Sequence, residues 1–578
     1  MIREITTTVV VVIVALATSF IVHSSAAANV YSDSVPCVIV TTDELRPVFD
    51  DYAAFKTRHG LNTEVITLTE IDTMYAGDTV VTKIREYLRN RYTNNYTEFA
   101  ILGGDVDVVP GTHVDWYGGI KVFTDMCYSC LNGEWDTDND DVIAEPPAYG
   151  DTVDFSRQLA VGRFPCRDTG QARILVNKVL SYMTYDGGAG TKTSALLMST
   201  WLTRDNDGAE INAALAAILP AEFDTVTFYQ EFDPENVFAA MNAGPAITIN
   251  NSHAQWEQSF LTYFIDGPPN GSTRRYLTRE DIDTLSNTNS YGVFFNYACY
   301  NGMLDSAYAL ARHYMLCPSG GGAGYVGSTN MEWSVDRLGF HEEILNQVFD
   351  SGAVQIGKAL SNARELIVPS HELSWGSKWC LFFSTIYLGD PSMEIWTTDP
   401  GHLVIANCAD TLEPGQQALS VLVSCDSQPV QGVTVCVWKQ GDAYATAVTD
   451  SLGVANLTEV DFQTEGEAYV SAVKHDFFPA ERTIALVKCC SGRVGDANCS
   501  GGDEPTVLDI NAIQDFLYGS GDPLCCLTEA DVNQSGGGNP TGDDITITDI
   551  NILVDYLYIS GPYDPVYNPE GVVLPDCL

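Results

Sequence analysis

Basic side chains are scarce in this sequence. It has 29 Lys and Arg against 76 Asp and Glu in 578 residues, which gives a formal net charge of −47. A protein that binds nucleic acid needs a basic surface to neutralise phosphates, so a charge of this size and sign excludes that class of partner. Ca²⁺ suits an acidic chain better, but only carboxylates at regular spacing indicate a metal site, because acidic surfaces are also simply soluble.

Long apolar runs are absent beyond the N-terminus. The apolar run at residues 9–22 follows Arg3 and precedes three small residues that end at Ala28. It is shorter than the roughly 20 residues that a membrane span needs. The layout predicts a signal peptide over residues 1–28 and a secreted mature chain, extracellular or at the cell surface, with no transmembrane span. An uncleaved membrane anchor is the alternative.

Cysteines are sparse in the middle of the chain and crowded at its end. In a secreted chain, 16 cysteines indicate disulfides whose connectivity stays open at this stage. Those in the terminal region are Cys489, Cys490, Cys499, Cys525, Cys526 and Cys577.

Short apolar strands alternate with amphipathic helices over most of the chain, a pattern typical of an α/β fold with mostly parallel sheets. The first series contains the strand VPCVIVTT, the helix DELRPVFDDYAAFKTRHG and the strands NTEVITLTE and EFAILGGD. A second series begins near Ser194 with ALLMST and continues through AITINNS, GVFFNYAC and GAGYVGST. We therefore predict an N-terminal α/β subdomain at 29–192 and a catalytic α/β subdomain at 193–398.

The pattern changes after residue 398. Residues 399–488 contain apolar runs of period two, such as LSVLVS and VTVCVW, separated by turn segments, which predicts an immunoglobulin-like β-sandwich. Residues 489–578 contain a duplicated unit, GDANCSGGDEPTVLDINAIQDFLYG against ADVNQSGGGNPTGDDITITDINILVDYLYI. Two copies of one small helical module are expected there.

Two of the apolar strands end in residues that can react. AITINNS is followed by His253, and GVFFNYA is followed by Cys299. Ligands bind beyond the carboxyl ends of strands in open α/β sheets, so both side chains are expected at one edge. A thiolate with an imidazole suits acyl transfer through a thioester. The alternative is a structural thiol or half of a disulfide, with an unrelated loop histidine.

Around these residues the sequence resembles the gingipain-type cysteine peptidases. The resemblance implies a caspase-like catalytic fold with His253 and Cys299 as the catalytic pair, and an oxyanion held by the backbone N–H groups of Ala254 and Cys299. The family usually has glycine where Ala254 stands, which restricts the backbone if a positive φ is required there. The matching segments are TTDELRPVFDDYAAFKTRHGLNTEVITLTEI, FAILGGDVDVVPG, LAVGRFPCRDTGQARILVNKVLSYM, LTREDIDTLSNTNSYGVFFNYACYNGMLD, GGGAGYVGSTN and YLGDPSMEIW.

Some members of this family add an acidic residue upstream of the histidine that orients the imidazole or lines the specificity pocket. Asp205, Asp207 and Glu210 lie in the corresponding stretch, although solvated acids are common in so acidic a chain. Trp256, Glu257 and Trp333 are candidate pocket walls, and core packing explains the tryptophans equally well.

Two regions have carboxylates at the spacing of calcium loops. LNGEWDTDNDDVIAE places acids at alternate positions, and the terminal repeats place oxygen ligands at first, third and fifth positions before an apolar helix. The repeats resemble a dockerin, which implies structural Ca²⁺ and a cohesin-like partner. A solvated acidic turn and a calcium-stabilised spacer are the respective alternatives. The predicted ligands are Asp136, Asp138, Asp140 and Glu145 in the first region, and Asp496, Asn498, Ser500, Asp509, Asp531, Asn533, Ser535 and Asp549 in the repeats.

The sequence thus predicts a secreted cysteine endopeptidase that acts on protein or peptide substrates through Cys299 and His253. Two alternatives remain. One is a non-catalytic extracellular adhesion protein on a degenerate peptidase fold, and the other is a transpeptidase that uses an amine in place of water.

Overall fold

The computed structural model describes most of the chain from residue 34 to residue 576. The signal peptide predicted at 1–28 lies outside this range. No helix among the described residues combines the length and the apolar character that crossing a membrane requires. The gaps within the range are 117–119, 139, 141, 146–149, 152–153, 155, 189, 204–205, 231–232, 262–274, 332–333, 368–375, 488–489, 491–492, 501–503, 520–522 and 538–539.

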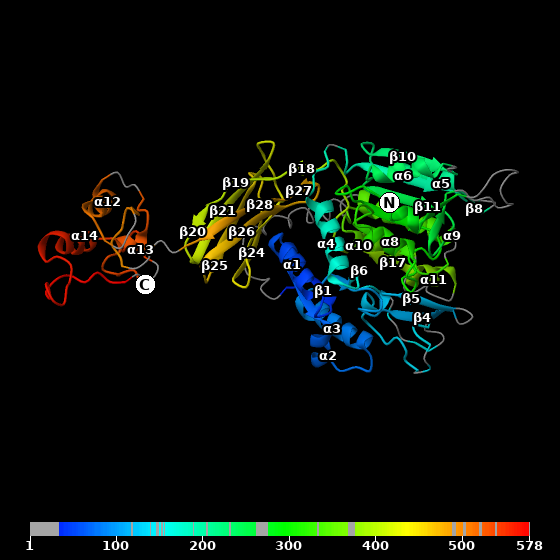
Figure 1. The fold of residues 1–578 in the computed structure, drawn as a ribbon, viewed down its shortest axis with the longest axis horizontal. Coiled ribbons are helices and arrows are strands. Elements are labelled where there is room, and N and C mark those ends of the chain that lie inside the picture. The colour runs from blue at the N-terminus through cyan, green and yellow to red at the C-terminus, as the bar shows by residue number, and fades with distance from the viewer. Residues whose placement is uncertain are drawn as a thin grey trace, which may run out of the picture. The chain divides into compact units, whose positions relative to one another are not determined.

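A single sheet of ten strands runs through the α/β region (Figure 1). Its neighbours pair in parallel except for β17, which is antiparallel to β16 and parallel to β6. The predicted α/β fold with a mostly parallel sheet is confirmed, and strands from both predicted subdomains join in this one sheet. In spatial order they are β10 (Asp224–Tyr229), β7 (Ser194–Ser199), β11 (Ile247–Asn251), β15 (Val293–Tyr297), β16 (Gly324–Ser328), β17 (Thr385–Leu388), β6 (Ala160–Phe164), β3 (Phe99–Gly103), β1 (Cys37–Thr41) and β2 (Thr63–Thr67).

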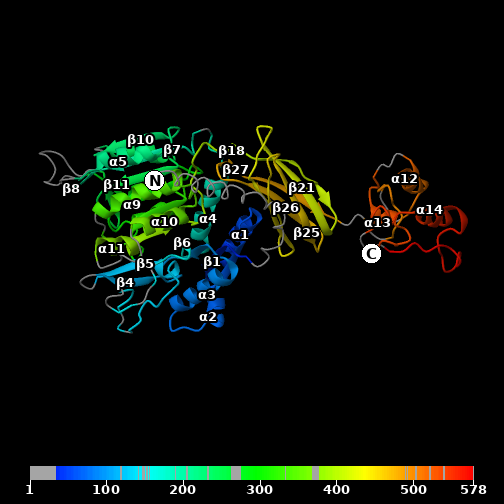
Figure 2. The same ribbon diagram turned by 180° about the vertical axis from the view of Figure 1, so that it is seen from behind.

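Helices and small hairpins surround this sheet. In the views of Figures 1 and 2, α11 lies beside the β4–β5 hairpin and packs against β5. The helices are α1 (Arg46–Arg58), α2 (Leu68–Met74), α3 (Val80–Asn95), α4 (Thr169–Thr184), α5 (Gly208–Ile218), α6 (Pro234–Asn242), α7 (Arg279–Ile282), α8 (Leu310–Leu316), α9 (Ser334–Phe349), α10 (Ile356–Ile367) and α11 (Ser377–Ser384). The hairpin strands are β4 (Thr112–Trp116), β5 (Ile120–Thr124), β8 (Trp201–Thr203), β9 (Asn206–Asp207), β12 (Ala254–Gln255), β13 (Gln258–Phe260) and β14 (Tyr276–Thr278).

The sequence pattern explains α1 well. Pro47 opens the helix, and Val48, Phe49 and Tyr52 bury one face on the core. The predicted strand NTEVITLTE is too long, because it ends at Thr67. The Thr67 side chain accepts from the Glu70 amide and the Glu70 carboxylate accepts from the Thr67 amide, a capping box that starts α2.

The region after residue 400 forms two small sheets around a separate apolar core. One contains β19 (Val404–Asn407), β21 (Gly415–Cys425), β22 (Gln428–Pro429) and β25 (Val454–Phe462). The other contains β20 (Thr411–Leu412), β28 (Ala480–Leu486), β26 (Gly466–Val473), β23 (Thr434–Lys439) and β24 (Ala443–Val448). A short pair, β18 (Gly401–His402) with β27 (Phe477–Phe478), completes the strands.

The terminal region has its own apolar core, and its described residues form the helices α12 (Val507–Tyr518), α13 (Leu527–Ala530) and α14 (Ile547–Val554), followed by a π-helical turn at Asp555–Ile559. Cys499 and Cys525 form a disulfide, and Cys490 and Cys526 each take part in a disulfide. In the α/β region, the thiols of Cys37, Cys127, Cys166 and Cys317 are buried and reduced. Among the described residues, cross-linking is thus confined to the terminal region.

Candidate active site

His253 and Cys299 lie beyond the carboxyl ends of two neighbouring strands. β11 and β15 pair in parallel, and their last register pair is Asn251 with Tyr297. His253 and Cys299 each follow two residues later. The register that aligns the strands therefore delivers the imidazole and the thiol to the same edge of the sheet, where both are half-buried.

A backbone carbonyl orients the imidazole. His253 Nε2 lies 2.9 Å from the carbonyl oxygen of Leu202. A carbonyl can only accept, so Nε2 carries the proton and Nδ1 is the basic nitrogen of the neutral ring. Leu202 is held beside the strand end because the Thr200 amide donates to the Asn251 carbonyl at 3.0 Å. A backbone carbonyl in this role leaves no signal in a sequence.

The chain turns sharply after Cys299. Tyr300 has a φ of 61°, a left-handed conformation that costs a non-glycine residue on the order of 1 kcal/mol. Its amide donates to the Asn330 carbonyl at 2.9 Å, and Asn301 Nδ2 donates to the Asn296 carbonyl at 2.9 Å. Burial, together with the nearby Cys299 and Cys380 thiols, raises the pKa of Tyr300. These hydrogen bonds fix the turn that presents the thiol.

Buried amides and hydroxyls lie beneath the reactive pair. Asn250 Nδ2 donates to Asn296 Oδ1 and to Ser252 Oγ, at 2.8 Å in each case. Asn296 Nδ2 donates to the Tyr325 hydroxyl at 2.7 Å, and that hydroxyl donates to Asn301 Oδ1 at 3.0 Å. All of these residues are buried. These hydrogen bonds join the ends of β11 and β15 to each other and to Tyr325 and Asn301, so the network helps to hold both strand ends in place.

Ala254 directly follows the histidine and lies in β12. The Phe260 amide donates to the His253 carbonyl at 2.9 Å, and Ala254 pairs with Ser259. The alternation of an antiparallel ladder then turns the Ala254 N–H away from β13. The φ of Ala254 is not positive. Alanine therefore replaces the expected glycine without the backbone restriction that the sequence suggested.

The predicted third acid is only partly visible. Asp205 lies outside the described residues, and for Asp207 only the backbone is described, in β9. Glu210 is exposed in the first turn of α5 and forms no ion pair with another described residue. Of the three, only Glu210 has a described side chain, and no hydrogen bond or ion pair among the described residues joins it to the imidazole.

The candidate wall residues of the specificity pocket differ in where they lie. Trp333 lies outside the described residues. Trp256 is 44% exposed in the turn between β12 and β13, so it is not a core residue. The Glu257 carboxylate lies 3.8 Å from the Arg279 guanidinium.

The first acidic loop gathers its carboxylates into two overlapping groups. Asp136 and Asp138 meet Asp151, and Asp138 also meets Asp140 and Glu145; within each group, one oxygen per residue lies within 4.8 Å of the others. Asp151 was missed by sequence analysis because it falls outside the regular spacing. It is buried and accepts from the amides of two loop residues, one of them Glu145 at 2.7 Å.

The surroundings of these groups fit a cation. Burial and neighbouring carboxylates raise the pKa of Glu145 and of Asp151. None of the ion pairs among the described residues involves these carboxylates, so no side chain neutralises them there. Gly150 has a φ of 156°, which favours glycine, and a Cβ there would come within 2.6 Å of Asp138 Oδ2, so the chain passes close to the carboxylates. The region is a cluster that can hold a metal ion.

The terminal repeats share one internal geometry. In the first copy, Asp496 accepts from the Ser500 amide at 2.8 Å and Asp509 from the Asn498 amide at 3.1 Å. In the second copy, the corresponding carboxylates accept from the corresponding amides. Asn498 Oδ1 is buried without a hydrogen-bond donor among the described residues, as expected of an oxygen that faces a cation. The second-copy bonds join Asp531 to the Ser535 amide at 3.0 Å and Asp549 to the Asn533 amide at 2.9 Å.

A parallel sheet that presents a thiol and an imidazole at one edge fits the fold of a cysteine-type endopeptidase, and the comparisons agree. The profile of peptidase family C25 matches residues 31–396, and the chain belongs to this family. The fold and the enzyme class predicted from the sequence are thereby confirmed.

Two solved structures share this fold. The Arg-specific cysteine proteinase gingipain R superposes with a TM-score of 0.61 at 15% identity, over 79% of this chain and 98% of that chain. The complex of the RgpB pro- and mature domains of Porphyromonas gingivalis gives 0.60 at 16% identity, over 78% of this chain and 100% of that chain. No curated protein matches the sequence.

Proposed function

We propose that Cys299 is the nucleophile and His253 the acid–base partner of this peptidase, and that its substrates are polypeptides outside the cell. The observation that supports this assignment is the shared register of β11 and β15, which ends both strands at one edge and places the two residues at equal offsets beyond the pair Asn251 and Tyr297.

The proposed reaction has two stages. Cys299 Sγ, deprotonated by His253 Nδ1, attacks the scissile carbonyl, and the amides of Ala254 and Cys299 stabilise the oxyanion. The imidazolium then protonates the leaving amine, and the C–N bond breaks to leave a thioester. In the second stage, the imidazole takes a proton from water as the water attacks the thioester, and returns that proton to the departing thiolate. The Leu202 carbonyl keeps the ring oriented through both stages.

Incubation with an unfolded protein substrate tests the assignment. Wild type is expected to cleave it, and Cys299→Ala and His253→Ala are each expected to lose at least about 10³-fold in kcat. Residual cleavage by Cys299→Ala equal to wild type would exclude Cys299 as nucleophile. No cleavage by folded wild type across varied substrate sequences would favour the adhesion protein. Ligated products in the presence of an added amine would favour transpeptidation.

We also propose that Ca²⁺ occupies the acidic loop and both terminal repeats, and that the chain is exported by the segment at 1–28. The clustered carboxylates of the acidic loop and the matching oxygen donors of the two repeats support the metal assignment, since oxygen donors at this spacing select hard cations. Ca²⁺ there has a structural role. Mass analysis of the N-terminus of protein secreted by the producing cell tests export, and an N-terminus at Met1 would contradict it.

The terminal repeats are proposed to dock on a cohesin-like partner. Equivalent apolar side chains are exposed in both copies: Val507 with Ile547, and Tyr518 with Tyr558. Duplicated exposed side chains suit a binding surface better than a spacer. Calorimetric titration of the full chain with cohesin domains tests this, and the variant with both tyrosines replaced by alanine is the control. Absence of binding to every cohesin in the presence of Ca²⁺ would leave the spacer role.

A further inference from the structure

A fully buried carboxylate lies at the end of β3, in the half of the sheet that does not carry the reactive pair. Asp105 is 0% exposed. Its Oδ1 accepts from the Val106 amide at 2.9 Å, and its carbonyl accepts from the Val108 and Val109 amides. A buried charge is tolerated only with partners of opposite charge.

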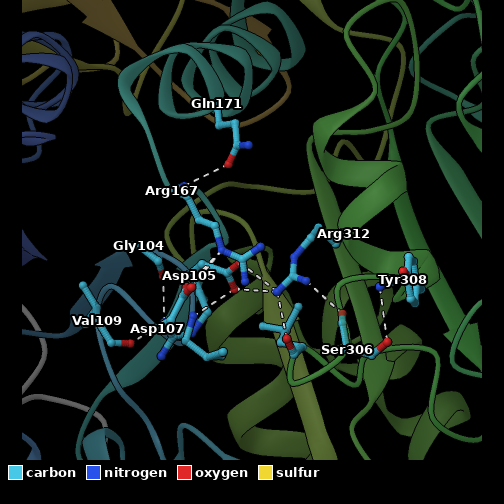
Figure 3. Close-up of polar contacts among 12 residues, drawn as sticks. Gly104, Asp105, Asp107, Val109, Arg167, Gln171, Ser306, Tyr308 and Arg312 are labelled. Carbon is cyan, nitrogen blue, oxygen red and sulfur yellow. Dashed lines mark hydrogen bonds and ion pairs between the residues drawn. The ribbon is translucent and has the colours of Figure 1, made fainter.

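Two arginines supply that charge (Figure 3). Arg312, from α8, lies 2.8 Å from Asp105 Oδ1 and 2.7 Å from Oδ2. Arg167 lies 3.1 Å from Oδ2 and also pairs with the exposed Asp107 at 3.0 Å. The two differ in burial, because the Arg312 side chain is 6% exposed and that of Arg167 is 40% exposed.

Of these two arginines, Arg312 also donates hydrogen bonds to backbone carbonyls in the segment that follows Cys299. Its Nη2 donates to the Leu304 carbonyl and its Nη1 to the Ser306 carbonyl, at 2.8 Å in each case. Figure 3 shows Arg312 between Asp105 and Ser306, with Arg167 reaching the same carboxylate. We call residues 300–309 the nucleophile loop, because they connect Cys299 to α8.

The nucleophile loop is tied to both reactive residues. At its start, Tyr300 adopts the left-handed turn that follows the thiol. At its end, the Leu310 amide donates to the Trp256 carbonyl at 2.7 Å, in the hairpin that begins directly after His253. A shift of the loop would therefore move the backbone on both sides of the site.

We propose that Arg312, fixed by Asp105, is a positioning residue of the active site: it clamps the nucleophile loop so that the thiol and the oxyanion amides keep their places. This inference rests on the proposed function of Cys299 and His253. The first half of the sheet thus contributes to catalysis through Asp105 without touching substrate. Misplacing reacting groups by about 1 Å is enough to lose on the order of 10²-fold in rate.

Three variants distinguish the positioning of the nucleophile loop from charge balance at Asp105. They are Arg312→Gln, Arg312→Lys and the matched control Arg167→Gln. Each full-length variant is assayed for kcat and KM on an unfolded protein, for its melting temperature, and for amide hydrogen exchange in peptides that cover 300–309. Arg312→Gln is expected to lower kcat at least tenfold with KM within threefold, and to speed exchange in the loop at least tenfold. Arg167→Gln should stay within twofold of wild type in kcat, in KM and in the exchange rate of the loop, and its melting temperature should be close to wild type.

The conservative variant distinguishes positioning from stability. Arg312→Lys keeps a cation at Asp105 but loses the fork that holds two carbonyls, so its melting temperature should fall less than that of Arg312→Gln while kcat stays reduced. Wild-type loop exchange and kcat in Arg312→Gln, or equal losses in Arg167→Gln, would overturn the proposal. If Arg312→Gln fails to fold, wild-type exchange and kcat in Arg312→Lys would overturn it. If wild type itself cleaves nothing, the proposed function fails and exchange alone decides whether Arg312 clamps the loop.

Discussion

Asn250 donates a 2.8 Å side-chain hydrogen bond to Asn296, its register partner on the neighbouring strand. Each asparagine stands three residues before a reactive residue, Asn250 before His253 and Asn296 before Cys299. The bond is thus a lateral tie between the two strands just before their chains leave the sheet. Because this bond joins register partners, the register of the two strands determines where the imidazole and the thiol lie relative to each other.

Asn296→Ala is expected to destabilise the protein and to impair catalysis. The change leaves buried donors on Asn250 and Ser259 without their acceptor, at a cost of about 2–4 kcal/mol. Denaturant unfolding should show this cost, and kcat should fall at least about tenfold well below the melting temperature.

Asn287→Ala is the control for that change, because Asn287 is also buried and bonds backbone of residue 321, on a loop that carries neither reactive residue. It should lose stability but keep kcat. Equal kcat in both variants would mean that the Asn250–Asn296 bond is only structural.

Ala254→Pro tests the oxyanion donor. Proline removes the N–H, and because Ala254 occupies a non-hydrogen-bonded position of the hairpin, no ladder bond is lost. We expect kcat to fall about 10²–10³-fold. Ala254→Gly keeps the N–H and should stay within about threefold of wild type. Alkylation of Cys299 by iodoacetamide should proceed at the wild-type rate in both, and a slowed rate would show that proline disturbed the pair instead.

Asp151→Ala should weaken Ca²⁺ binding at the acidic loop. Asp151 joins Asp136 and Asp138 in one group and also holds loop backbone. At Ca²⁺ concentrations 100 times the dissociation constant, bound ion stabilises the fold by about 3 kcal/mol, so chelation should lower the melting temperature of wild type more than that of the variant. Asp154→Ala, a nearby acid outside both groups, should respond to chelator like wild type. Equal responses of all three proteins would place no Ca²⁺ at Asp151.

Lys178 should impose a pH dependence on stability. Its ammonium is buried against the C-terminal carbonyls of α8, with Nζ 2.8 Å from the Met315 carbonyl, and burial lowers its pKa from 10.5 to about 7. Between these values the unfolded chain holds the proton and the folded chain does not, so stability rises with pH. Below about pH 7 the ammonium is charged in both states, so the full cost of burying its charge lowers the free energy of unfolding.

The measurement is the unfolding free energy of wild type relative to Lys178→Met from pH 7 to pH 9. Wild type should gain about 1.4 kcal/mol per pH unit over the variant in this window. Lys358→Met, at an exposed lysine, should keep the wild-type slope. A difference between wild type and Lys178→Met that does not change with pH would show that Lys178 does not titrate there.

Local pattern was enough to predict the strands that carry the reactive residues. β11 and β15 are continuous buried runs, and the carboxyl-edge rule then placed His253 and Cys299 together. The T-x-x-E pattern at Thr67 marks the start of α2, but the prediction extended the strand over it and missed this helix.

What the sequence did not reveal depends on contacts between distant residues. The carbonyl of Leu202 orients His253 by position alone, and Asp151 joins the acidic cluster through the path of its loop. The pair Asp105 and Arg312 is separated by most of both α/β series, and although Asp105 ends the strand EFAILGGD, nothing in the sequence marks Arg312 as its partner. Such partners are chosen by tertiary packing, for which one sequence has no periodic signal.

The position of β17 in the sheet restricts the order in which this protein can fold. The strand lies between β16 and β6, yet it is the last strand of the sheet to be synthesised. Until Leu388 has left the ribosome, the nascent chain presents two unpaired edges, and such edges associate with other chains. Export that keeps the polypeptide extended until it is complete would protect it, and a chain truncated before Thr385 would aggregate rather than persist as a separate N-terminal half.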